Sequence, residues 1–127
     1  SLLVFSAITP LTLAPLLGPV PYDPQRDIAP LIAWMATPVL VLGTPALGVA
    51  SLAEAIAFAR RAPGALRWAS SGVGTTGHLV QQRVAEAAGV VVTHVPYSGG
   101  GQQLTDAIGG QFELLSSNVA ALQLRLV

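Results

Sequence analysis

The sequence predicts an α/β fold in which helices flank a parallel-rich β-sheet. From Ser51 onward, segments with helical periodicity alternate with short strand-like segments. The strand-like segments are apolar on both faces, as is typical of parallel strands buried between helices. The chain has 127 residues, of which 52% are hydrophobic and 9% charged, so it can bury a hydrophobic core and is not expected to be disordered.

The charge pattern excludes several classes of partner. Six arginines balance six acidic residues, lysine is absent, and no basic run occurs. A neutral chain without a basic patch is not expected to bind nucleic acid. Cysteine is absent, which excludes disulfides and thiol chemistry, and two histidines with few acids make a poor metal site. We therefore expect no metal and no cofactor.

The first third of the chain predicts short elements separated by prolines. Residues 2–6 (LLVFS) read as a buried strand, and residues 11–17 as a short helix. Two further apolar runs, 31–35 and 39–42, predict strands. Pro38 lies between them, at a break or a sheet edge, because proline cannot donate to a ladder.

Two charge-free stretches, residues 1–22 and 28–53, are long enough to be tested as membrane spans, which need about 20 apolar residues. Prolines and glycines interrupt both of them, so neither is predicted to cross a membrane. The first stretch does not read as a signal peptide either. It has no basic region before Leu2 and no A-x-A cleavage site at its end.

Helix signals become clear from Ser51. Ser51 and Glu54 form a capping box, apolar residues then follow helical spacing to Arg61, and Pro63-Gly64 stops the helix. Residues 66–70 predict a strand. The next helix is capped by Thr75 or Thr76 and ends at Gly89. The remaining predicted elements are a strand at 90–95, a helix at 102–108, a strand at 112–115 and a last helix capped by Ser117 or Asn118.

The loop after the 66–70 strand is the main candidate site. Residues 72–77 spell G-x-G-x-x-G, with a strand before and a helix after. Such a unit presents backbone N–H groups and the positive end of the helix dipole, so it favours an anion. Two nucleotide interpretations fit poorly. No acid follows the next strand to hold a ribose, and His78-Leu79 replaces the Lys-Ser/Thr of a P-loop.

A hydrolase is a third interpretation, because Ser70, Ser71, His78, His94 and Asp106 supply the residue types of a triad. The G-x-S-x-G nucleophile elbow is missing, so local packing is the better account of these residues. What remains is a loop rich in neutral donors. It suits a carboxylate held by hydrogen bonds, or it only caps the helix, and the pattern leaves both open.

Four segments together resemble the substrate-binding proteins of tripartite tricarboxylate transporters. They are PYDPQRDIAPL (21–31), SLAEAIAFARRAPGALRWASSGVGTTGHL (51–79), GVVVTHVPYSGGGQQLTDAIGGQFELL (89–115) and SNVAAL (117–122). The resemblance runs in order over nearly the whole chain. It implies a type II periplasmic-binding-protein fold, in which two α/β lobes close on a small carboxylate, and a receptor that is not an enzyme.

The same resemblance implies a periplasmic location and delivery of the ligand to membrane permease subunits. The carboxylate is expected on backbone amides and small hydroxyls. Tyr97 also fits a packed turn residue, and Asn118 also fits a helix cap. The matching positions are Ser70, Ser71, Gly72, Thr75, Thr76 and His78, with Tyr97 and Asn118 as weaker candidates.

Family members are longer than this chain, so the resemblance implies most of one lobe. We expect residues 1–45 to be a remnant of lobe one with connecting strands, and residues 46–127 to be an incomplete lobe two. Apolar surface built to be covered would favour self-association. The alternatives are a fragment of a nucleotide-binding enzyme that uses the 72–77 loop, and a truncated remnant that binds nothing.

Overall fold

Two separately packed parts make up the structure, a computed structural model that describes residues 2–118. The first part ends at Ala36 and the second begins at Thr37. Assignment of the segments 1–45 and 46–127 to two lobes stays a prediction. No helix among the described residues is both long enough and apolar enough to cross a membrane.

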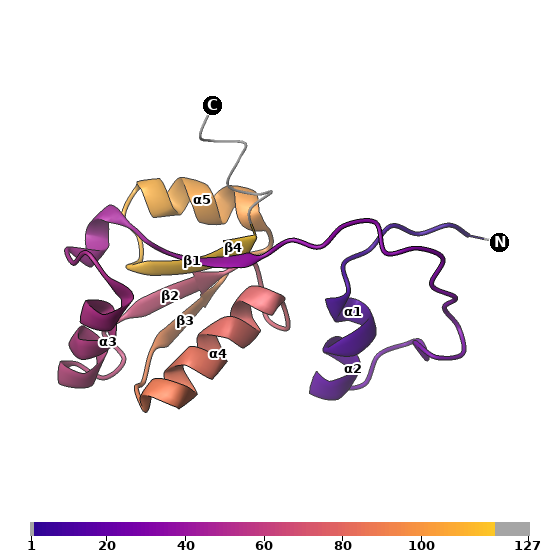
Figure 1. Ribbon diagram of the computed structural model, residues 1–127, viewed down its shortest axis with the longest axis horizontal. Helices are drawn as coiled ribbons and strands as arrows, with labels where there is room; N and C mark the ends of the chain where they lie inside the picture. The colour runs from indigo at the N-terminus through magenta and orange to yellow at the C-terminus, as the bar shows by residue number, and fades with distance from the viewer. Residues whose placement is uncertain (1, 119–127) are drawn as a thin grey trace. The chain divides into compact units, whose positions relative to one another are not determined.

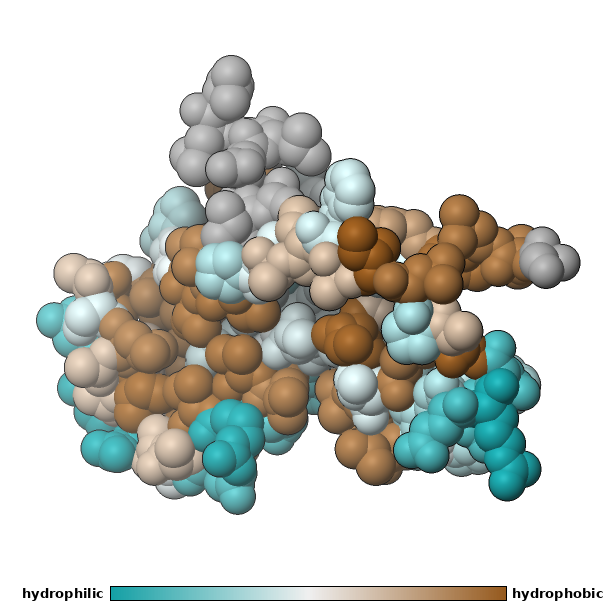
Figure 2. All heavy atoms as spheres, turned by 45° about the vertical axis from the view of Figure 1, so that its right-hand side comes forward, coloured by the Kyte–Doolittle hydropathy of each residue, from teal (hydrophilic) through white to brown (hydrophobic). Residues whose placement is uncertain are grey.

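The first part carries little regular structure. Its helices are α1 (Thr9–Thr12) and α2 (Ala14–Leu17), which cover the predicted 11–17 helix. The Tyr22 hydroxyl donates to the carbonyl of Pro10 at 2.6 Å and ties the proline-rich connection to α1. Residues 2–36 contain no buried side chain, and hydrophobic colouring runs along the chain near the N-terminus in Figure 2.

Two predicted strands in this part are wrong. Residues 2–6 and 31–35 form no strand, and Leu3, Phe5, Ile32 and Trp34 are largely exposed. An apolar run becomes a strand only where a neighbouring strand accepts its hydrogen bonds. No strand of the described residues pairs with either segment.

The second part is built on a four-stranded sheet of order β1-β4-β2-β3 (Figure 1). The pairs β4–β2 and β2–β3 are parallel, and β1 pairs with β4 antiparallel. This confirms the parallel-rich sheet, with one antiparallel edge strand added. The strands are β1 (Val39–Gly43), β2 (Arg67–Ser70), β3 (Thr93–Pro96) and β4 (Leu114–Asn118).

The helices α3 and α4 begin and end where the local signals predict, and α5 begins two residues before the predicted 102–108 helix. Ser51 caps α3 (Leu52–Arg61) by accepting from the Glu54 amide, and the Glu54 carboxylate accepts from the Ala50 amide. Thr75 caps α4 (Thr76–Ala88), which ends at Gly89 with φ of 62°. The remaining elements are α5 (Gly100–Ile108) and a 3₁₀ turn, η1 (Pro45–Leu47). The predicted last helix after Asn118 lies outside the described residues.

Helices cover both faces of the sheet (Figure 1), and the buried apolar side chains form two clusters. On one face, Trp68 and Leu114 pack with Ala55 and Ala59 of α3 and with Val84 of α4. On the other face, the core residues are Ala69, Leu115, Phe112 and Ala107, the last of them from α5. Helices on both faces explain why the strands read as apolar on both sides.

Candidate functional site

The glycine loop leads from the carboxyl end of β2 into the first turn of α4. Thr75 joins the loop to the helix. Its hydroxyl donates to the Gly72 carbonyl at 2.7 Å and accepts from the His78 amide at 3.4 Å. Gly72 has φ of +142°, and a Cβ there would lie 3.2 Å from the carbonyl oxygen of Tyr97. This position therefore requires glycine.

Ser70 is fully buried at the end of β2 and lies below the loop. Its Oγ accepts from the Gly72 amide at 3.2 Å and lies 3.1 Å from the Gly72 carbonyl. The same Oγ lies 2.7 Å from Nε2 of His94 on β3. These bonds give Ser70 a role in holding the loop, while its contact with a ligand stays a prediction.

The two histidines of the chain stack on each other beside the loop. The ring centroids of His78 and His94 are 4.1 Å apart, with 2° between the planes. His78 Nδ1 accepts from the Gly74 amide at 3.2 Å, and its Nε2 lies 3.3 Å from the side-chain nitrogen of Gln82. Burial lowers the pKa of His94, and the charge of His78 lowers it further. Sequence reasoning placed His78 near the loop but missed the stack.

Unlike the hydroxyls of Ser70 and Thr75, those of Ser71 and Thr76 do not hold the loop. Within the part of the chain that the structure describes, their hydroxyls are outside the hydrogen-bond network of the loop, and Thr76 is exposed. Amides in the first turn of a helix also lack a partner within the helix. The donors that remain for a ligand are therefore the neutral hydroxyls of Ser71 and Thr76 and the amides at the start of α4.

A second loop joins β3 to α5 at the same edge of the sheet, because β2 and β3 are parallel. It lines an open surface pocket of about 440 Å³, formed by Pro96, Tyr97, Ser98, Gly99, Gly101 and Gln102. No side chain of residues 2–118 caps α5, so the first amides of this helix have no side-chain partner there. The G-G-G pattern at 99–101 indicates a helix N-terminus without a side-chain cap, because glycine has no side chain that could accept from the amides. The prediction of the site from the sequence did not use this pattern.

Tyr97 is anchored rather than free. Its hydroxyl donates to Asp106 Oδ2 at 2.8 Å, and its ring packs edge-on against Phe112. Burial and the hydrogen bond to Asp106 raise the pKa of Tyr97 to about 12. Asn118 is the exposed last residue of β4. The helix that it was expected to cap lies outside the described residues, so its roles as a cap and as a ligand contact stay predictions.

The structure does not assemble the triad that the residue types allowed. Ser70 and His94 are in contact, but the Asp106 carboxylate is taken by Tyr97 and by Gln102, whose Nε2 donates to it at 2.7 Å. Within residues 2–118, no three His, Cys, Asp or Glu side chains are grouped so that they could hold a metal ion.

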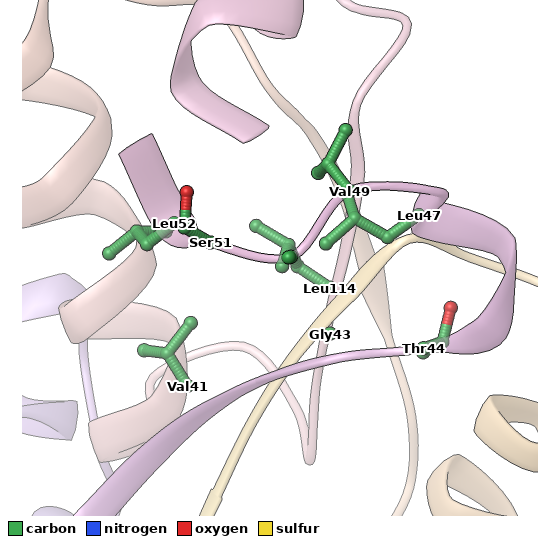
Figure 3. Close-up of a pocket in the computed structure, with 9 residues that line it drawn as sticks. Val41, Gly43, Thr44, Leu47, Val49, Ser51, Leu52 and Leu114 are labelled. Atoms are coloured by element: carbon green, nitrogen blue, oxygen red, sulfur yellow. The ribbon is translucent and has the colours of Figure 1, made fainter. Parts of the chain in front are cut away.

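Another pocket, of about 330 Å³, is lined by residues of β1, β4 and the segment from Thr44 to Leu52, and by none of residues 70–78 or 96–103 (Figure 3). Val41, Leu47, Val49, Leu52 and Leu114 supply apolar walls, and Thr44 and Ser51 are its polar side chains. The Thr44 hydroxyl is already used, because it donates to the Phe112 carbonyl. We assign no chemistry to this pocket.

Comparisons with known proteins agree with the fold. The solved structure of R. palustris Rpa4515 with adipate has a TM-score of 0.77 and 36% identity, and the match covers 83% of this chain and 35% of that one. MatC from Rhodopseudomonas palustris, with bound malate, also has a TM-score of 0.77, with 93% of this chain and 39% of that one covered. At 24% identity, the MatC likeness concerns the fold alone.

Sequence relatives lead to the same group. Protein BugT of Bordetella pertussis is 29% identical over 111 residues, which are 87% of this chain and 34% of BugT. The chain thus spans about a third of the length of that relative. Residues 2–126 match the model of the tripartite tricarboxylate transporter family receptor. The chain therefore belongs to this receptor family.

Proposed function

We propose that this chain is the carboxylate-binding part of a solute receptor for a tripartite tricarboxylate-type transporter. The observation that carries the proposal is the set of unused neutral donors where α4 and α5 begin at one edge of the sheet. Residues 70–78 and 96–103 contain no Asp, Glu, Lys or Arg. Hydrogen bonds and helix dipoles would therefore hold the carboxylate without a permanently charged partner.

The relative Rpa4515 with adipate supports this class of ligand. In the proposed mechanism, the amides and the hydroxyls of Ser71 and Thr76 capture one carboxylate end. The pocket beside Tyr97 and Gly99 would take the rest of the molecule. In a complete receptor, a second lobe would then close over the ligand, and permease subunits would receive it outside the cytoplasm. The chain itself carries out no chemical step.

Isothermal titration calorimetry with adipate, and with adipamide as the neutral isostere, tests the proposal. Adipate should bind and adipamide should not, since only the anion benefits from the helix dipoles. The double variant Ser71→Ala, Thr76→Val should bind adipate more weakly. A Leu79→Ala variant, altered at an exposed residue on the same helix, is the matched control. Binding of NAD or ATP instead of carboxylates would refute the proposal.

Self-association is a second part of the proposal. Leu2, Leu3, Phe5, Leu31 and Trp34 are each at least three-quarters exposed in a segment with no buried side chain. Apolar surface on this scale is unfavourable in water and favours burial against another copy. Light scattering at micromolar concentration should show dimers or larger species, and a stable monomer would contradict this expectation.

A further inference from the structure

Two imidazole rings hold the glycine loop, His78 by a direct hydrogen bond and His94 through Ser70. His78 Nδ1 accepts from the Gly74 amide, and His94 Nε2 contacts Ser70 Oγ, which in turn accepts from the Gly72 amide. The stacked rings therefore reach two of the three glycines of the G-x-G-x-x-G loop. Residues 70–77 themselves contain no side chain that titrates near neutral pH, so a change of charge near pH 7 at the loop would come from the histidines.

The bond to Gly74 fixes the proton position in neutral His78. Because Nδ1 accepts a hydrogen bond, it carries a lone pair, and the ring proton lies on Nε2. A protonated His78 has N–H on both nitrogens and can no longer accept from Gly74. Protonation would therefore release the Gly74 amide and add a positive charge beside the proposed carboxylate site.

A bound carboxylate would favour the charged form of His78. His78 lies in the first turn of α4, beside the amides that would hold the carboxylate, and an anion at that place attracts an imidazolium. The parallel His94 ring remains neutral more readily, because burial lowers its pKa, and a neutral ring can stack against a cationic one.

Other charged groups on the surrounding elements are already paired. On β2, Arg67 binds Glu113, and further along α4, Arg83 lies 3.5 Å from Glu86. On α5, Asp106 is held by Tyr97 and Gln102. On β3, His94 is the titratable residue. Among the described residues, the two histidines are thus the titratable side chains that bond directly to residues 70–74.

We propose, on the basis of the proposed carboxylate-binding function, that His78 is a positioning residue that takes up a proton when the carboxylate binds. The released Gly74 amide then joins the ligand's donors. By thermodynamic reciprocity, affinity for the carboxylate rises as the pH falls. The site would therefore favour ligand capture in mildly acidic surroundings and release at higher pH.

Side-chain ¹⁵N NMR can test this directly, because the full chain contains only two histidines. Spectra are recorded between pH 6.5 and 8.5, where adipate stays ionised, with and without saturating adipate. Without adipate, neutral His78 should show the Nε2–H tautomer. With adipate, a larger fraction of His78 should be protonated at the same pH, and the Gly74 amide resonance should shift. Adipate affinity should be roughly fivefold higher at pH 6.5 than at pH 8.5.

Two variants distinguish the contribution of His78 to the pH dependence from that of His94. His78→Asn keeps an acceptor near the Nδ1 position but cannot take up a proton, so its adipate affinity should not change between pH 6.5 and 8.5. His94→Gln keeps a polar group near Ser70 and leaves His78 titratable, so it should retain the pH dependence. Loss of the pH dependence in His94→Gln with retention in His78→Asn would overturn the assignment to His78.

The remaining outcomes are also decisive. If the amides of residues 71–77 shift with adipate while His78 protonation does not change, carboxylate binding stands and proton linkage is refuted. An Nδ1–H tautomer of free His78 would refute the linkage as well. If no amide shifts with adipate at either pH, both the proposed function and this inference are refuted.

Discussion

Ser116 Oγ on β4 donates a hydrogen bond to the Gly77 carbonyl on α4 at 2.7 Å. The same Oγ accepts from the indole nitrogen of Trp68 at 3.2 Å. A buried strand hydroxyl thus joins the largest core side chain to the first turn of the helix that follows the glycine loop. The position of the candidate site therefore depends on the core of the sheet.

Gly77→Ala should destabilise the fold, although alanine is the better helix former. The new Cβ would lie 3.0 Å from the Ser116 carbonyl oxygen and 3.1 Å from its Oγ, inside the buried centre of the sheet. We expect a loss of about 1–3 kcal/mol of unfolding free energy in urea denaturation. Gly101→Ala on α5 meets open space and should be neutral or stabilising by up to about 1 kcal/mol. Equal effects of the two substitutions would contradict this explanation.

Thr75→Ala should lower the unfolding free energy by about 1 kcal/mol, because the hydroxyl caps α4 and also binds the Gly72 carbonyl. Thr75→Ser keeps both bonds and should stay within a few tenths of a kcal/mol of the wild type. Chemical denaturation measures both values. A Thr75→Ser variant as unstable as Thr75→Ala would show that the methyl group matters rather than the cap.

Gln81 is completely buried on α4, and among residues 2–118 neither its Nε2 nor its Oε1 has a hydrogen-bond partner. Burying an unpaired amide costs about 1–3 kcal/mol. Gln81→Met, which has a similar shape, should therefore raise the thermal midpoint of unfolding. Gln81→Glu should lower it at pH 7, since it places a charge at the same buried position. A lowered midpoint for Gln81→Met would mean that the amide has a partner in solution.

Glu113 forms a bidentate pair with Arg67, with Nη2 to Oε1 at 2.6 Å and a further bond from the Arg67 amide at 2.7 Å. Burial raises the pKa of Glu113, but these bonds and the arginine charge outweigh it and hold the pKa below its usual range. A lowered carboxyl pKa contributes stability above about pH 4.5 that is lost as the pH falls through the folded-state value.

Glu113→Gln should therefore cost about 1–2 kcal/mol at pH 7 and much less at pH 3, as measured by denaturation at both pH values. Glu86→Gln is the matched control, because both side chains of its ion pair with Arg83 are about three-quarters exposed and the pair spans 3.5 Å. That substitution should change the stability little at either pH. A pH-independent cost for Glu113→Gln would show that packing rather than charge is lost.

His94 should make the fold less stable at mildly acidic pH. Burial lowers its pKa from 6.5 in the folded state, and the charge of His78 adds to this effect. The unfolded chain therefore binds a proton first, so stability is full above pH 6.5 and falls as the pH drops through the lower folded-state pKa. Thermal unfolding at pH 7.5 and 5.5 should show this decrease. His94→Gln should reduce it, and an unchanged decrease would assign the effect to other groups.

Local signals in the sequence predicted the helices well. Ser51, Thr75 and Gly89 lie at the expected helix ends, because caps depend on residues only a few positions away. The strands expected at 2–6 and 31–35 failed because a strand needs a partner that local pattern cannot supply. The antiparallel pairing of β1 with β4 was missed for the same reason.

In the candidate site, too, the features set by local sequence could be predicted, and those set by tertiary contacts could not. The anion-favouring start of α4 follows from the order strand, glycine loop, helix, and the structure has that order. The sequence could not separate the engaged hydroxyls of Ser70 and Thr75 from those of Ser71 and Thr76, because the path of the folded loop decides which hydroxyl meets a partner. The stack of His78 on His94 depends on how α4 lies against β3, which no spacing within the sequence encodes.

The pairing of β1 with β4 also has a consequence during synthesis. The register places Gly43 opposite Leu114, so β1 leaves the ribosome long before β4, its partner strand in the described part of the chain, is made. Until then, the apolar VLVLG segment has no ladder to join and is open to contacts with other nascent chains. Closing so long a loop is slow, so formation of this edge pair is expected to be a late step of folding.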